Sequence, residues 1–133
     1  MTLLLAHAQA QDADLQLRCK GTVESAGSKF PTNVKSEEFD LKVNRATGRA
    51  SGGYAELITE SERFSSRATD VEFEGDGTGK TVLPDAHVYP IGFYKLNRST
   101  GSFVLSVSLM FSKDQTYVEY RVRATCEEAR KKF

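Results

Sequence analysis

The chain has 133 residues, and its 18 basic residues balance its 18 acidic residues, so the formal net charge is zero. This length predicts one domain that buries roughly two thirds of the surface of the unfolded chain. The balanced charge gives no overall field that would gather nucleic acid or an anionic membrane surface, and it does not favour a basic partner. The longest apolar run after the start is far shorter than the roughly twenty residues of a membrane helix. We therefore expect a soluble protein that binds no nucleic acid and is peripheral to a membrane at most.

Residues 1–10 have the pattern of the end of a secretory signal peptide. Residues 3–5 are three leucines from an apolar region, and residues 8–10 form the small-x-small pattern that signal peptidase accepts. Gln11 would then begin the mature protein, and residues 11–133 would form a single secreted all-β domain. Because the basic region of a signal peptide is missing, a disordered Ala-rich tail is the alternative.

Apolar and polar side chains alternate with a period of two in five segments, which are residues 15–23, 39–43, 71–73, 103–111 and 118–124. This alternation predicts half-buried antiparallel strands, because successive side chains of a strand point to opposite faces. Turn signals separate the segments at 27–28, 75–79, 84–85 and 113–115, and at two Asn-Arg-x-Thr-Gly sequences. The spacing predicts an all-β fold, an antiparallel β-barrel or sandwich of about seven to nine strands.

The two Asn-Arg-x-Thr-Gly sequences lie within residues 43–49 and 96–102. Asn accepts hydrogen bonds from backbone N–H groups one or two residues on, and Gly adopts the positive φ that returns the chain to an antiparallel ladder. We therefore expect two similar hairpin turns. The repeat indicates the fold and does not identify a catalytic or binding group.

Residues 56–69 do not have a clear period. They contain enough Glu, Ser, Arg and Ala for a short helix, but Leu57, Ile58 and Phe64 do not form a helical stripe. We predict a strand, a turn and a second strand here. The alternative is one short helix packed across an open end of the sheet.

The two cysteines, Cys19 and Cys126, lie near opposite ends of the chain on predicted strands. Cys19 shares a strand face with Leu17 and Val23, and Cys126 shares one with Val122, so both thiols are expected to point inward. A disulfide between the first and last strands would close a loop of about a hundred residues and add roughly 4–5 kcal/mol in the chain-entropy account. It would indicate an exported protein. Two buried free thiols in a cytosolic protein are the alternative.

Several elements together resemble a group of small secreted proteins of Gram-negative bacteria. The elements are a leader, an early strand with Cys-x-Gly (Arg18-Cys19-Lys20-Gly21), a central strand and turn (41–48), an Asn-Arg-x-Thr-Gly hairpin (97–101) and a final Cys strand with a basic tail ending in Phe (126–133). The resemblance covers most of the expected mature chain. It implies the fold and export, and because that group has no assigned activity it implies nothing catalytic.

Residues 75–81 look like a phosphate-binding loop but do not match one. The P-loop spacing requires a glycine at position 74, which is Glu74, and no helix follows because the chain runs into Pro84. We predict a flexible hairpin loop here. The nearby acidic residues do not have the spacing of a calcium loop, so we expect them to be solvated.

The sequence offers no catalytic or metal-binding constellation. His87 is the one histidine outside the leader, it lies between prolines, and no nucleophile elbow is present. No Cys-x-x-Cys or His-Cys arrangement is present, and no pair of glycosidase carboxylates can be nominated. We expect a protein that is not an enzyme, and that uses no metal and no cofactor.

Residues 87–94 form the densest aromatic segment of the chain. In a loop, His87, Tyr89 and Tyr94 would offer an amphipathic contact patch of the kind that interfaces favour. The alternative is that Ile91, Phe93 or Tyr94 are core residues of a strand leading into the second turn.

A second candidate contact lies just after the first turn, at Ser51, Gly52 and Tyr54. This segment resembles the Ser-Gly-x-x-Tyr loop that secreted bacterial inhibitors of c-type lysozyme insert into the enzyme, with one residue fewer in the spacing and without the usual Trp. The resemblance implies an inserted inhibitory loop. Strand glycines that permit sharp coiling are the alternative.

Taken together, these features predict a periplasmic or secreted binding module of the cell envelope, with a protein or envelope component as its partner. One alternative is an inhibitor of a secreted hydrolase such as c-type lysozyme, through Ser51, Gly52 and Tyr54. Another is a barrel that holds a small apolar ligand, which an interior filled with Phe and Leu side chains would exclude.

Overall fold

The computed structural model describes residues 14–81, 88–111 and 115–128. The predicted signal-peptide remnant, the mature start at Gln11, the turn at 84–85 and His87 lie outside these residues. The described part contains eight strands and one short helix, in the order β1 (Asp14–Gly27), β2 (Phe30–Asn44), β3 (Ala50–Ser51), α2 (Glu56–Thr59), β4 (Ser61–Ala68), β5 (Glu72–Thr81), β6 (Val88–Asn97), β7 (Ser102–Phe111) and β8 (Thr116–Glu128).

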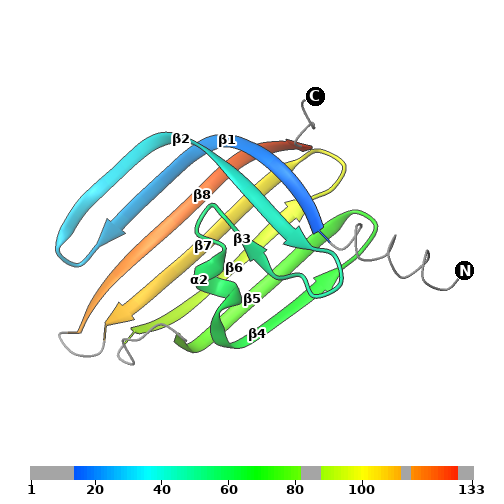
Figure 1. The fold of residues 1–133 in the computed structure, drawn as a ribbon. Helices are drawn as coiled ribbons and strands as arrows, with labels where there is room; N and C mark the ends of the chain where they lie inside the picture. The colour runs from blue at the N-terminus through cyan, green and yellow to red at the C-terminus, as the bar shows by residue number, and fades with distance from the viewer. Residues whose placement is uncertain (1–13, 82–87, 112–114, 129–133) are drawn as a thin grey trace, which may run out of the picture.

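All eight strands form one antiparallel sheet in the order β3-β2-β1-β8-β7-β6-β5-β4. The sheet curls into a half-barrel, with α2 on its concave side (Figure 1). The predicted all-β fold and the number of strands are therefore confirmed. Of the two architectures expected, the structure is closer to the barrel, because its described strands form a single curled sheet.

The first and last long strands are neighbours, and the disulfide joins them. Cys19 of β1 lies directly opposite Cys126 of β8 in the antiparallel ladder, and the two sulfur atoms are bonded across a sequence separation of 107 residues. Both cysteines are buried on the concave face. The predicted pairing and the inward direction of both thiols are confirmed.

The two Asn-Arg-x-Thr-Gly turns have the same hydrogen bonds. Asn44 Oδ1 accepts from the N–H groups of Ala46 and Thr47, at 2.9 and 3.0 Å. Asn97 Oδ1 makes the equivalent pair of bonds in the second turn, both at 2.9 Å. The glycines that close the turns, Gly48 and Gly101, have φ of 70° and 77°. The predicted hairpins are confirmed, although Asn bonds to residues two and three positions on.

The prediction of strand, turn and strand over residues 56–69 was wrong in its first half. Residues Glu56–Thr59 form the helix α2, and Ser61–Ala68 form the edge strand β4. The chain must cross here from β3 at one edge of the sheet to β4 at the other, and a single helical turn buries Ala55 and Ile58, three residues apart, in the concave face. The alternative of a short helix packed on the sheet is the one observed.

The predicted flexible loop at residues 75–79 is also wrong, because this segment is the middle of β5. A Cβ atom at Gly75 would overlap the Tyr94 ring, and one at Gly77 would overlap the carbonyl oxygen of Ile58. Because these two positions have no side chain, the Tyr94 ring and the helix α2 can lie close to the backbone of β5.

The core fills the middle of the concave face. Its largest fully buried members are aromatic and aliphatic side chains from five elements, namely Tyr94, Phe73, Phe103, Leu41, Ile58, Leu96 and Leu105. The interior between the two ends of the half-barrel is therefore packed with side chains. Among the described residues, hollows lie toward both ends of this face.

Candidate binding site

One end of the concave face is left open by α2. A hollow of about 490 Å³ lies between the turn end of the β1–β2 hairpin and the start of β8, lined by Ser25, Ala26, Pro31, Asn33, Val118 and Tyr120. By strand alternation, Ser25, Asn33 and Tyr120 share the face of the core residues on their strands, so the hollow continues the concave surface.

A pair of stacked aromatic rings forms the boundary between this hollow and the packed core. The rings of Tyr54 and Tyr120 are nearly parallel, with centroids 4.6 Å apart and an interplanar angle of 14°. Tyr54 comes from the loop before α2, and Tyr120 comes from β8. A fixed pair of rings presents apolar area together with hydroxyl groups, and its ordering costs little further entropy on binding.

The loop that carries Tyr54 is held in place by its own backbone and by α2. Gly52, Gly53 and Tyr54 have φ of 93°, 56° and 70°, and a positive φ is uncommon for a bulky residue such as Tyr. The N–H of Gly52 donates to Glu56 Oε2 at 2.7 Å, which fastens the loop to the helix. Residues in such sparsely populated conformations often lie at functional sites.

Glu37 adds a carboxylate to the same face. It is two residues before Phe39 on β2, and strand alternation directs both side chains to the concave side. Its Oε2 atom is buried and has no hydrogen-bond partner in the part of the chain that the structure describes. Burial raises the pKa of the Tyr54 phenol, and the negative charge of Glu37 raises it further. An unpaired buried acceptor of this kind is costly in a folded protein.

Sequence reasoning did not select Glu37 as a functional residue. The signal for it was present, because a period of two places an acidic residue on the face that carries Phe39 and Leu41. Strand alternation places Tyr120 on the same face as Val122 and Cys126, but its stacking on Tyr54 depends on a loop that crosses the sheet.

The candidate contact at Ser51, Gly52 and Tyr54 does not project from the protein. Ser51 is exposed on β3, but the chain then lies against the sheet. A Cβ atom at Gly52 would overlap the Asp40 carbonyl, and one at Gly53 would overlap the Phe39 ring. Close approach to β2 therefore explains both glycines, and Tyr54 points to Tyr120.

The candidate patch at residues 87–94 is divided between two faces of β6. Tyr94 is fully buried, and its hydroxyl donates to the carbonyl of Gly48, so its assignment to a surface patch is corrected to the core. Ile91 and Phe93 are 56% and 38% exposed and point away from the core, in contrast to the alternative prediction for them. Tyr89 lies within β6, and His87 is outside the described residues.

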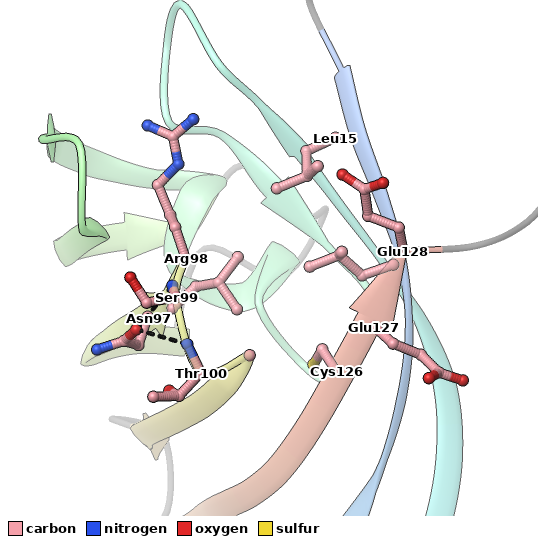
Figure 2. A pocket seen from close by; sticks show the side chains of 11 residues that line it. Leu15, Asn97, Arg98, Ser99, Thr100, Cys126, Glu127 and Glu128 are labelled. Carbon is pink, nitrogen blue, oxygen red and sulfur yellow. Dashed lines mark hydrogen bonds between the residues drawn. The ribbon is translucent and has the colours of Figure 1, made fainter.

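A second hollow, of about 250 Å³, lies at the opposite ends of β1 and β8 (Figure 2). Leu15, Leu17 and Leu96 supply apolar lining, and Arg98 and Glu128 are among the charged residues around it. The Arg98 guanidinium already donates to the Thr69 carbonyl at 2.9 Å, and it lies 4.7 Å from the centroid of the Phe73 ring. Arg98 is thus committed to the β4–β5 turn, which leaves the first hollow as the better candidate.

No group of three or more metal-ligating side chains occurs among the described residues, and none of their helices is long and apolar enough to cross a membrane. No family model matches the chain, and no curated protein or solved structure was found to be similar to it. The disulfide between Cys19 and Cys126 indicates an oxidising compartment outside the cytoplasm.

Proposed function

We propose that this protein is a non-catalytic binding module that holds a protein or envelope component in the hollow beside Tyr120. The observation that carries the proposal is the Tyr54–Tyr120 stack at the border of a hollow of about 490 Å³. Binding sites combine apolar walls with a few polar groups, and here Val118 and Pro31 lie beside Ser25 and the stacked phenols.

The periplasm or the extracellular space is the proposed location. The buried disulfide supports it, since such bonds persist in oxidising compartments. The leader pattern in residues 1–10 supports export independently of the disulfide.

Affinity capture with matched variants tests the binding proposal. Immobilised, oxidised wild-type protein is exposed to a detergent-free envelope extract of a Gram-negative bacterium, and retained material is identified after a salt wash. We expect one saturable component, which Tyr120→Ala fails to retain because the stack is lost. Tyr117→Ala is the control, since Tyr117 lies on the same strand but is 40% exposed on the outer face.

Two results would contradict this proposal. One is a column that retains nothing, and the other is equal retention by wild type, Tyr120→Ala and Tyr117→Ala. Unfolding in urea, measured for each variant, separates a lost contact from a lost fold.

Inhibition of a secreted hydrolase such as c-type lysozyme is a second proposal, favoured by the exposure of Ser51 beside the constrained loop at Gly52 and Tyr54. It predicts that the wild-type protein inhibits lysozyme and that Tyr54→Ala loses the inhibition. A wild-type protein that leaves lysozyme activity unchanged would remove this second proposal.

A further inference from the structure

Within the described part of the chain, most of the outer edge of β2 is uncovered. Among the residues that the structure describes, β2 pairs on that side only with β3, at Lys42 and Val43, whereas its other side pairs with β1 along almost its whole length. The chain at Gly52 lies against the carbonyl of Asp40. From Glu38 back toward the hairpin, no strand of the described chain pairs with this edge.

Alternation along β2 determines which residues direct their backbone N–H and C=O groups away from β1. The N–H of Asn44 donates to the Arg49 carbonyl at 2.8 Å, and the carbonyl of Asp40 faces Gly52, so residues with even numbers direct their backbone groups outward. The register with β1 is one-to-one from Asn44 to Asn33, so the alternation is unbroken. The N–H and C=O groups of Val34, Ser36 and Glu38 therefore point away from β1, and a free strand edge of this kind is a template for another strand.

The charged side chains next to this edge differ between the two faces of β2. Glu38 and Asp40, on the convex face, are paired with Arg18, at 3.1 and 2.9 Å. Lys35 and Glu37 lie on the concave face by strand alternation, and the structure contains no ion pair between them. The buried oxygen of Glu37 thus lacks a partner within the described chain and lies next to the uncovered edge.

We propose that a second copy of this chain covers the edge, pairing its own β2 antiparallel to this one about a two-fold axis at Ser36. In that register Lys35 of each protomer lies opposite Glu37 of its partner, on the concave face. The pairing occurs twice because the interface is isologous. Each Glu37 carboxylate gains a cation, and Val34, Ser36 and Glu38 gain backbone partners.

The same two charges disfavour the neighbouring registers. A two-fold axis at position 35 would place two lysines opposite each other, and an axis at position 37 would do the same with two glutamates. Like charges directly opposite on paired strands are destabilising, whereas opposite charges stabilise. The ladder ends near Asp40, where Gly52 already covers the edge.

Sedimentation velocity of the oxidised 133-residue chain, from low micromolar to near-millimolar concentration, tests the dimer. We expect concentration-dependent dimerisation of the wild type. Lys35→Glu and Glu37→Lys should each raise the dissociation constant by about tenfold or more, because each reversal converts two attractive pairs into two repulsive pairs.

Restoring the complementary charges supplies the decisive comparison. The double variant Lys35→Glu/Glu37→Lys should dimerise as the wild type does, and the two single variants, when mixed, should form a heterodimer with two attractive pairs. Ser36→Pro should abolish dimerisation because it removes an outward N–H without removing a bond to β1, while Ser36→Ala should not.

Arg121→Glu is the control for the change of charge, because Arg121 is exposed on β8 away from this edge. A wild type that stays monomeric throughout the concentration range would overturn the proposal. So would a dimer that the single reversals leave unchanged, or that Arg121→Glu weakens equally. Tyr120→Ala should leave the dimer intact, so this test and the test of the binding hollow fail independently.

Discussion

Tyr94 fastens the first turn to the sheet from inside the core. Its ring is fully buried between β5 and β7, and its hydroxyl donates to the carbonyl of Gly48 in the turn. Burial raises the pKa of the Tyr94 phenol to about 12. The neutral phenol is therefore the form that the folded protein stabilises.

The raised pKa of Tyr94 predicts a loss of stability at alkaline pH. Because the folded-state pKa lies above the unfolded value of about 10, the stabilisation is complete below pH 10. It falls as pH rises toward 12, by an amount on the order of 2–3 kcal/mol. Urea unfolding measured as a function of pH would show this decline in the wild type.

Tyr94→Phe separates this phenol from the other groups that titrate at high pH. At neutral pH the variant should be less stable by about 1–2 kcal/mol, because the buried Gly48 carbonyl loses its donor. Between pH 10 and 12 it should lose less stability than the wild type. An equal decline in both proteins would show that Tyr94 does not cause the effect.

At the scale of elements, the helix α2 and the glycine-containing strand β5 depend on each other. The carbonyl of Ile58, in α2, lies where a side chain at Gly77 would be, and Ser61 Oγ donates to that carbonyl at 2.6 Å. The helix can pack on β5 only because this position of the strand has no side chain. Close packing of this kind leaves little room for relaxation.

Gly77→Ala should therefore destabilise the protein by about 1–3 kcal/mol, because the added methyl group forces α2 away from β5. Urea unfolding of the oxidised protein measures the change. Thr78→Ala, at the next and exposed position of β5, is the matched control and should have an effect near zero. Equal stability of the two variants would mean that α2 adjusts without cost.

At the scale of the whole molecule, the disulfide closes most of the chain into one loop. Cys19 and Cys126 are already neighbours through the β1–β8 ladder, so the bond constrains the unfolded chain more than it shapes the folded one. The paired strands and the core would remain without it.

Replacing both cysteines by alanine should lower the free energy of unfolding by about 3–5 kcal/mol, given a sequence separation of 107 residues. The far-ultraviolet circular dichroism of the folded variant should match that of the wild type. The reduced wild-type protein is the matched comparison and should show a similar loss of stability. A loss below about 1 kcal/mol would contradict the chain-entropy account.

The sequence by itself determined the features that depend on local periodicity and local hydrogen bonds. Alternation identified the main strands and the inward direction of Cys19 and Cys126, and Asn and Gly identified both hairpin turns, because a turn carries its own hydrogen-bond acceptor and its own positive φ.

Only the tertiary structure decided the features that depend on segments far apart in the chain. The glycines of β5 are typical of a loop in the sequence, and only the packing of α2 and Tyr94 against them explains why they lie within a strand. Tyr94 could not be assigned to core or surface without the turn that accepts its hydrogen bond. The stacking of Tyr54 on Tyr120 and the uncovered edge beside Glu37 follow from where β3 stops and the chain crosses the sheet, and no local pattern encodes that crossing.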